Sequence, residues 1–194
     1  STMTEIDNQL LFDEGLSAKG KSIIEQNMNL DLKAAYERSM ELAKAHTPIS
    51  VGVLKHLASL VMRRTGGEVN GFGGSFDSSR GDLRLVNVTA GAGGKTYMNY
   101  QKVPQKLEEF CKEINERRKE LLESPDIYEQ YKLSFYAHLK LVTIHPWVDG
   151  NGRMSRLIMN HLQYEFGLVP SKVVKDDKAE YIKALKNSQE EESE

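Results

Sequence analysis

Apolar side chains recur with a period near 3.6 along most of the chain, which predicts helices. The first predicted helical stretches are residues 22–27 and 32–45. A second helix is predicted to begin at Thr47 and Pro48, as its cap and its first residue. Pro104 then opens an amphipathic helix with a charged outer face.

The segment 127–144 is apolar over more than one face, so we expect a buried and central helix there. It is predicted to end at His145, because Pro146 disfavours helix in the residue before it. Two helices follow, one that ends at Gly167 and a last one over residues 176–185.

Nine glycines between residues 66 and 94 exclude long helices from that region. Inside it, residues 83–88 are typical of a strand and residues 95–100 of its partner, which predicts a small β-hairpin. The predicted fold class is therefore mainly α, a helical bundle with one small hairpin.

Composition narrows the class of protein. At 194 residues the chain fits one domain with a hydrophobic core. Its 26 Lys and Arg against 28 Asp and Glu make no basic field, which argues against nucleic acid as a partner. Cys111 is the only cysteine, which excludes intrachain disulfides and favours a reducing compartment. The stretch 133–144 is too short and too polar to span a bilayer, and the first ten residues lack a signal pattern, so we expect a cytoplasmic protein without membrane contact.

The candidate chemistry lies in the loop after the buried helix, His-Pro-Trp-Val-Asp-Gly-Asn-Gly-Arg-Met-Ser-Arg at residues 145–156. Gly150 and Gly152 allow a sharp turn that exposes N–H groups at a helix N-terminus, where the helix dipole favours an anion. Arg153 and Arg156 are three residues apart, so they project to one side and suit phosphate oxygens. We interpret the loop as a phosphate-binding site.

Two more residues of this loop indicate what could happen to a bound phosphate. Asp149 supplies a hard oxygen ligand of the kind that Mg²⁺ takes beside substrate phosphates. His145 can take a proton from an attacking hydroxyl. Together they indicate phosphoryl or nucleotidyl transfer. The alternative is a Gly-rich turn with a capping aspartate and two solvated arginines.

These twelve residues resemble the Fic signature, His-Pro-Phe-x-Asp/Glu-Gly-Asn-Gly-Arg-x-x-Arg. Trp147 replaces Phe, an aromatic exchange that should still anchor the loop in the core. Val103-Pro104 and Tyr181-x-x-Ala184-Leu185 also resemble Fic elements. Many members carry Gly-x-x-Arg before the hairpin, where this chain has Gly67-Glu68-Val69-Asn70.

The resemblance implies a Fic fold that transfers AMP from ATP to a hydroxyl of a protein and releases pyrophosphate. His145 would be the general base, and Asp149 would hold Mg²⁺. In the Doc branch, which resembles a kinase in its reaction, lysine replaces the second glycine, so Gly152 favours adenylyl transfer. The residues expected against the phosphates, from the α- to the γ-phosphate, are Gly150, Asn151, Gly152, Arg153 and Arg156.

The segment 90–100 lies where the family has its flap, which holds the target by adding the target's extended segment as a strand. Lys95, Thr96 and Tyr97 are the expected target contacts. The alternative is an ordinary polar loop.

The N-terminal sequence Lys21-Ser22-Ile23-Ile24-Glu25-Gln26-Asn27 resembles the inhibitory helix of many Fic proteins, Ser/Thr-x-x-x-Glu-Gly/Asn. Glu25 would pair with Arg156 and exclude the γ-phosphate; the alternative is a surface glutamate on an amphipathic helix. The expected parts of the chain are an N-terminal segment with this helix, a Fic domain and an acidic tail, at residues 1–29, 30–188 and 189–194.

Three functions are compatible with these residues: a protein adenylyltransferase, a Fic enzyme of another reaction such as de-adenylylation or phosphotransfer, and a non-catalytic nucleotide-binding regulator. His145 argues against the third, because nucleotide binding alone needs no base. The expected partners are ATP and a protein target, and a homo-oligomer is compatible with the sequence.

Overall fold

The computed structural model of this chain describes residues 22–91 and 93–172. Most of these residues are helical, and the sheet among them has two antiparallel strands, which confirms the predicted fold class. The predicted last helix (176–185), the match at 181–185 and the acidic tail lie outside the described residues. The elements are α2 (Ile23–Lys44), α3 (Val51–Val61), β1 (Glu68–Gly71), β2 (Gly74–Asp77), the 3-10 helices η1 (Ser78–Arg80) and η2 (Tyr100–Lys102), α4 (Val103–Glu123), α5 (Ile127–Ile144) and α6 (Asn151–Glu165).

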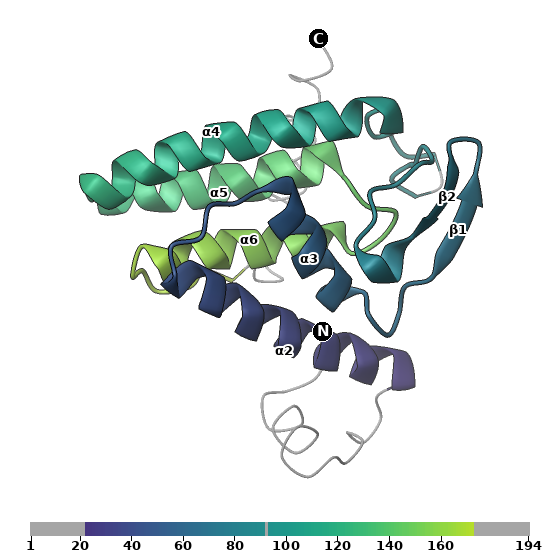
Figure 1. Ribbon diagram of the computed structural model, residues 1–194, viewed down its shortest axis with the longest axis horizontal. Coiled ribbons are helices and arrows are strands. Elements are labelled where there is room, and N and C mark those ends of the chain that lie inside the picture. The colour runs from purple at the N-terminus through teal and green to yellow at the C-terminus, as the bar shows by residue number, and fades with distance from the viewer. Residues whose placement is uncertain (1–21, 92, 173–194) are drawn as a thin grey trace.

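Helix α5 lies in the middle of the bundle, as predicted. It packs against α4 on one side and α6 on the other, and α2 covers α6 from beyond (Figure 1). Its inward side chains are among the fully buried apolar residues of the core: Leu133, Ala137, Leu141 and Ile144. Among the described residues, no helix is long and apolar enough to cross a bilayer.

Helix α2 is one continuous helix, where the sequence predicted two stretches separated at residues 28–31. The polar residues of that gap are buried and hydrogen-bonded, so they do not end the helix. Asn29 Nδ2 donates to the carbonyl of Glu25 at 2.8 Å. The carboxylate of Asp31 accepts from the main-chain N–H of Arg64 at 2.8 Å and from its Nη1 at 2.6 Å.

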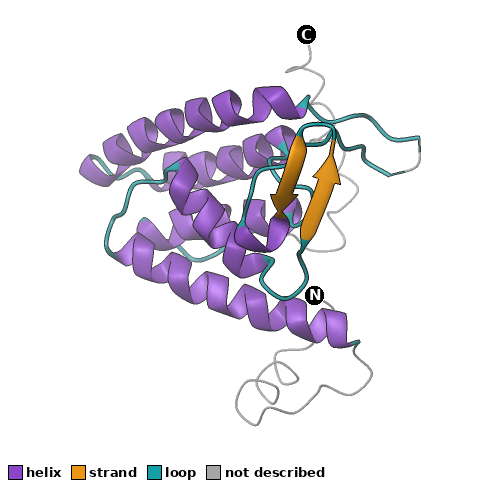
Figure 2. Cartoon of the chain, turned by 45° about the vertical axis from the view of Figure 1, so that its right-hand side comes forward, coloured by secondary structure: helices purple, strands orange, loops and turns teal. Residues whose placement is uncertain are grey.

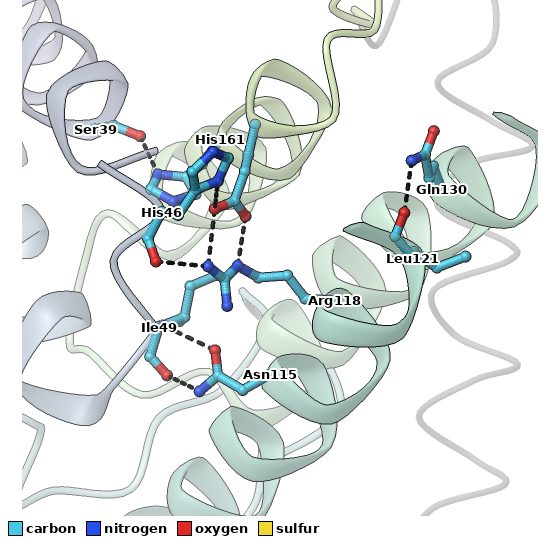
Figure 3. Close-up of polar contacts among 9 residues, drawn as sticks. Ser39, His46, Ile49, Asn115, Arg118, Leu121, Gln130 and His161 are labelled. Carbon is cyan, nitrogen blue, oxygen red and sulfur yellow. Dashed lines mark hydrogen bonds and ion pairs between the residues drawn. The ribbon is translucent and has the colours of Figure 1, made fainter. Parts of the chain in front are cut away.

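Helix α3 begins later than predicted. Ser50, and not Thr47, caps it, since the Ser50 hydroxyl accepts a main-chain N–H three residues on at 3.0 Å. The start is delayed because Asn115 of α4 binds the extended main chain of Ile49, accepting its N–H at 2.9 Å and donating to its carbonyl at 2.7 Å (Figure 3). A tertiary contact therefore overrides the local Thr47-Pro48 signal.

A buried polar network joins α4, α6 and the end of α2 (Figure 3). Arg118 of α4 makes a bidentate ion pair with Glu165 of α6: Nε donates to Oε1, and Nη2 donates to Oε2 at 2.9 Å. Nη2 also donates to the His46 carbonyl at 2.8 Å. His46 Nδ1 lies 3.1 Å from the same carboxylate. Ser39 of α2 contacts Nδ1 of His161 at 2.7 Å. The network fixes the end of the bundle opposite the loop at residues 145–150.

The predicted hairpin is placed differently in the structure. The two-stranded sheet pairs Glu68 with Asp77 and closes at Gly71 and Gly74, earlier in the glycine-rich region than expected. Residues 83–91 and 93–99 instead belong to no strand, and this part of the chain reaches outward from the helices on the right of Figure 2. Within the described residues of this segment, Thr89, which follows the first predicted strand, makes an isolated antiparallel bridge with Thr96 of the second. The strand prediction for 83–88 and 95–100 is therefore wrong.

Arg84 explains why these segments form no ladder. Its side chain is only 1% exposed, where an alternating strand pattern would turn it to solvent. Its guanidinium donates to the carbonyls of Val86 at 2.9 Å and of Met98 at 2.6 Å. These main-chain acceptors, which a β-ladder would use, are taken by one buried side chain.

Candidate active site

The loop between α5 and α6 is closed by two left-handed residues. His145 ends α5 with φ 52°, and Gly150 begins α6 with φ 83°. Between them Trp147 is 1% exposed, and its Nε1 donates to the Gly81 carbonyl at 3.1 Å. This confirms the expectation that the aromatic residue in place of Phe anchors the loop in the core.

Asn151 braces the loop from inside. Its Nδ2 donates to the Trp147 carbonyl at 2.7 Å, and its Oδ1 accepts the Trp147 N–H at 3.0 Å. Both ends of the amide are therefore occupied by the loop. We expect Asn151 to meet a phosphate through its main-chain N–H, at the start of α6.

The N-terminus of α6 offers unpaired donors. The first intrahelical bond of its N-terminal turn runs from the Met154 N–H to the Gly150 carbonyl at 2.9 Å. Among the described residues no side chain caps this helix. Arg153 lies beside these amides, and its Nη1 is buried there without a hydrogen-bond partner. A buried unsatisfied guanidinium nitrogen next to free helix amides fits an anion.

The predicted residues of the loop line one cavity of about 230 Å³. Its lining consists of Val148 and all seven residues singled out from the signature: His145, Asp149, Gly150, Asn151, Gly152, Arg153 and Arg156. The structure thus brings together every predicted residue of residues 145–156. A larger cavity of about 500 Å³ between α2 and α6 shares Arg156 as a wall.

Asp149 stands at the rim of the cavity with its side chain 69% exposed. Its Oδ1 accepts the Gly150 N–H at 2.7 Å and lies 3.7 Å from Nη2 of Arg153. Within the described part of the chain, no cluster of three or more ligand side chains could hold a metal ion alone. A single exposed carboxylate beside an anion site fits Mg²⁺, which binds through one or two carboxylates, substrate phosphates and water.

His145 is neutral at physiological pH. Burial lowers its pKa to about 4, and the positive charge of Arg84 adds to that shift. A hydrogen bond with the Val142 main chain and the Asp149 carboxylate oppose the shift without overcoming it. Because Nδ1 is buried, Nε2 is the nitrogen left for a substrate. A neutral imidazole of this kind can accept a proton.

Arg156 is half-buried between the two cavities. Burial lowers its pKa, with Tyr36 opposing the shift and Arg153 reinforcing it. Tyr36 of α2 donates to Asn160 at 2.7 Å, and the two helices run in the same direction (Figure 1). At roughly 1.5 Å of rise per residue, Glu25 lies about 10 Å farther towards the helix N-termini than Arg156. Their pairing stays a prediction.

The three residues predicted as target contacts on the flap segment differ in exposure. Lys95 and Thr96 are exposed, whereas Tyr97 is half-buried. The Tyr97 ring stacks on the imidazole of His145, with centroids 3.7 Å apart and planes inclined by 10°. The flap segment therefore reaches the candidate base. In its described residues, the β-pairing is the isolated bridge of Thr96 with Thr89.

Sequence reasoning missed Arg84. Its Nε donates to the His145 carbonyl at 2.6 Å, and its main-chain N–H donates to the Pro146 carbonyl at 3.0 Å. Arg84 therefore holds the end of α5 from outside the signature. The sequence does carry a signal for it, because the Gly-x-x-Arg pattern that residues 67–70 lack is found at Gly81-Asp82-Leu83-Arg84. Gly81 is required there, because its φ is +79° and a Cβ would lie 1.9 Å from the Lys55 carbonyl.

Comparison with protein families decides the family to which this chain belongs. A family model described as Fic/DOC matches residues 48–163, which include the whole loop and the Gly-x-x-Arg element. The chain belongs to the Fic/DOC family. A curated Fic relative, named protein adenylyltransferase Fic, from Drosophila persimilis is 30% identical over 188 residues, or 96% of this chain and 33% of the relative. The chain thus spans about a third of the length of the curated Fic relatives it matches.

Solved Fic structures have the same fold. A Fic-domain signaling protein from Bacteroides thetaiotaomicron superposes with a TM-score of 0.74 at 18% identity, over 95% of this chain and 65% of that one. The structure of IbpAFic2 covalently tethered to Cdc42 matches with a TM-score of 0.59 at 20% identity, over 92% of this chain and 55% of that one. At these identities the match shows the Fic fold.

Proposed function

We propose that this protein is a protein adenylyltransferase, which transfers AMP from ATP to a hydroxyl side chain of a target protein. The observation that carries the proposal is one cavity that joins uncapped amides of α6, the unpartnered Nη1 of Arg153 and the neutral imidazole of His145. An anion site and a proton acceptor in the same cavity suit a hydroxyl attack on a phosphate. The name of the curated relatives supports the same reaction.

In the proposed reaction His145 acts as the general base. Nε2 takes the proton of the acceptor hydroxyl while the hydroxyl oxygen forms a bond to the α-phosphorus. The bond from the α-phosphorus to the oxygen that bridges to the β-phosphate breaks, and pyrophosphate leaves. Negative charge grows on the phosphate oxygens during this step, so the α6 amides and the guanidinium of Arg153 stabilise the transition state. Arg156 is proposed to hold the terminal phosphates.

Asp149 is the residue that would hold Mg²⁺. Its exposed carboxylate keeps an oxygen available beyond the Oδ1 that accepts the Gly150 N–H. Bound beside the phosphates, the ion would neutralise part of their charge. The variant Asp149→Ala would lose the carboxylate proposed to hold Mg²⁺, while it keeps the α6 amides and both arginines proposed to bind the phosphates.

The proposed target is a protein that presents a hydroxyl on an extended segment. The exposed Lys95 and Thr96 and the short Thr89–Thr96 bridge leave main chain accessible on the flap segment. An extended target segment could add to it as a strand. The structure of IbpAFic2 tethered to Cdc42 involves a protein partner for a protein of this fold, which supports a protein acceptor.

We further propose that Glu25 restrains the enzyme by pairing with Arg156. Glu25 lies in the first turn of α2, on the side of the molecule where α6 begins (Figure 1). A carboxylate on Arg156 would compete with the terminal phosphate of ATP for the same guanidinium. The wild-type protein would then transfer AMP slowly.

The identity of the transferred group tests the proposed function. The wild-type chain and the variants Glu25→Gln and His145→Ala are incubated with Mg²⁺, cell lysate as acceptor, and ATP labelled on the α- or the γ-phosphate. We expect protein-bound label from α-labelled ATP alone, most in Glu25→Gln and none in His145→Ala. Label from γ-labelled ATP would mean phosphotransfer and would overturn the proposal. ATP binding without label in any variant would favour de-adenylylation or a regulatory role.

A further inference from the structure

The aromatic ring of Tyr97 lies flat on the ring of the candidate base. The centroids of the Tyr97 and His145 rings are 3.7 Å apart, and their planes are nearly parallel at 10°. Lys95 and Thr96, which precede Tyr97 in the flap segment, are exposed, whereas Tyr97 is half-buried. The Tyr97 side chain is thus turned inward to the catalytic loop, unlike those of its two neighbours.

Main-chain contacts hold both partners of this stack. Arg84 donates to the His145 carbonyl at 2.6 Å and to the carbonyl of Met98, the residue after Tyr97, at 2.6 Å. The Tyr97 N–H donates to the Val88 carbonyl at 3.0 Å. One guanidinium therefore fixes the distance between the segments that carry the two rings. Charge-assisted bonds of this length are stronger than neutral ones, so the stack is supported from both sides.

We propose that Tyr97 is a positioning residue for His145, whose ring holds the imidazole in its orientation and keeps water from one of its faces. The inference rests on the proposed function, because the orientation of His145 matters to the reaction only if His145 takes a proton. A ring stacked on the face leaves the edge of the imidazole open. Since Nδ1 is buried, the open edge presents Nε2 to the acceptor hydroxyl.

The stack also suits the charge that the reaction creates. When His145 accepts a proton, the electron-rich face of the Tyr97 ring attracts the imidazolium. The charged groups that act on this imidazole are Arg84, which disfavours the proton, and Asp149, which favours it. Tyr97 carries no charge, so its contribution depends on ring contact and exclusion of water. Phenylalanine at position 97 should therefore preserve the effect of Tyr97 on His145, whereas an aliphatic residue should not.

The first test needs no target protein. The chain is labelled in its histidine rings, the His145 signal is assigned by its loss in His145→Ala, and its proton chemical shift and titration are followed by NMR. In Tyr97→Leu we expect the His145 signal to lose the ring-current shift of the stack. We expect its pKa to rise from about 4 towards the ordinary value of about 6.5, because burial is the largest cause of the low pKa and the hydration that water restores outweighs the lost attraction of the Tyr97 ring. In Tyr97→Phe we expect both to stay as in the wild type.

The second test measures the transfer of α-label from saturating ATP by the same variants. We expect a loss of about 10- to 100-fold in Tyr97→Leu and less than about threefold in Tyr97→Phe, since a slightly misplaced base costs up to two orders of magnitude. Tyr128→Leu is the control, because Tyr128 is 72% exposed at the start of α5 and should leave both the His145 signal and transfer unchanged.

Two results would overturn the inference. An unchanged His145 signal and titration in Tyr97→Leu would mean that the stack does not hold the imidazole. A changed signal with unchanged transfer, in a wild type that transfers AMP, would mean that the stack has no part in the reaction. If neither the wild type nor the Glu25→Gln variant transfers AMP, the proposed function is contradicted instead. The NMR comparison would then test only whether Tyr97 holds the His145 ring.

Discussion

The guanidinium of Arg84 binds the main chain of His145, with Nε 2.6 Å from the carbonyl oxygen. The Arg84 side chain is 1% exposed, and burial lowers its pKa to about 10, so it remains charged at neutral pH. Its other donors go to the carbonyls of Val86 and Met98. Among the described residues, the acceptors of this buried guanidinium are main-chain oxygens, and they connect the flap segment to the end of α5.

Replacing Arg84 tests whether its hydrogen bonds hold the flap segment to the end of α5. In Arg84→Met the carbonyls of the half-buried residues His145, Val86 and Met98 lose their donor. Each unsatisfied group costs about 1–3 kcal/mol where water cannot reach it. We expect the free energy of unfolding, measured by urea denaturation, to fall by roughly 2–4 kcal/mol. Arg80→Met is the matched control, since Arg80 is 81% exposed and should change stability by less than about 0.5 kcal/mol. Equal stability of the two variants would contradict the assigned role.

Gly152→Ala should separate stability from nucleotide binding. A Cβ at this position would lie 3.1 Å from Nη1 of Arg156, so the guanidinium must shift by a few tenths of an ångström. We expect ATP to bind about tenfold more weakly, a loss of about 1.4 kcal/mol, in calorimetric titrations. Thermal unfolding should show stability unchanged or raised by up to about 1 kcal/mol, because alanine is the better helix former.

The control for that variant is Gly52→Ala in α3. A Cβ there would lie 3.6 Å from the nearest atom, the Ser50 hydroxyl oxygen, which is an ordinary contact. Gly52→Ala should give the same helix stabilisation and leave the affinity for ATP unchanged. If both variants bind ATP like the wild type, Arg156 does not hold a phosphate.

Glu25→Gln tests the proposed restraint on Arg156. Loss of the carboxylate should free the guanidinium, and the affinity for ATP should rise about tenfold or more, since hydrogen bonds to charged groups contribute about 1.5–3 kcal/mol. Glu41→Gln is the control, because Glu41 lies on the same helix, 66% exposed, and pairs with Arg38. Equal ATP affinities for the two variants, measured by calorimetry, would show that Glu25 is a surface glutamate.

Acid should destabilise the protein through its buried histidines. Burial lowers the pKa of His138 and of His161 to about 4, as it does for His145. The unfolded chain binds protons at these histidines below about pH 6.5, whereas the folded chain binds them only below about pH 4. The free energy of unfolding therefore falls as pH drops from 6.5 to 4, by up to about 1.4 kcal/mol per pH unit for each histidine.

Urea denaturation at pH 7, 6 and 5 checks this dependence. His161→Asn removes one of these buried histidines. The slope of the unfolding free energy against pH should therefore decrease by the contribution of one bound proton. A flat profile between pH 7 and 5 in the wild type would contradict the burial of these rings in neutral form.

The signature loop could be predicted because its signals are local. Helix α5 ends where Pro146 requires it, and it begins after Asp126, which accepts the Glu129 N–H at 3.0 Å as a cap. The glycine at position 150 takes the left-handed conformation that the turn needs. Each of these features depends on residues within a few positions along the chain. The cavity at the start of α6 follows from them.

The elements that escaped prediction depend on distant contacts. Arg84 lies in a segment of alternating pattern that predicts a solvent-facing strand residue, but the acceptors of its side chain lie up to 61 positions away, at His145. The start of α3 is set by Asn115, 66 positions from Ile49. Only the Gly-x-x-Arg pattern at residues 81–84 marked the first of these in the sequence, and nothing local marked the second.

In the proposed site His145 performs the chemistry and other residues bind the nucleotide, and one paired measurement tests this division of roles. ATP affinity and α-label transfer are measured for Glu25→Gln and for Glu25→Gln/His145→Ala in the presence of Mg²⁺. We expect dissociation constants within about threefold of each other and a loss of transfer of at least about 100-fold in the double variant, the contribution expected of a general base. Transfer that persists without the imidazole would contradict it.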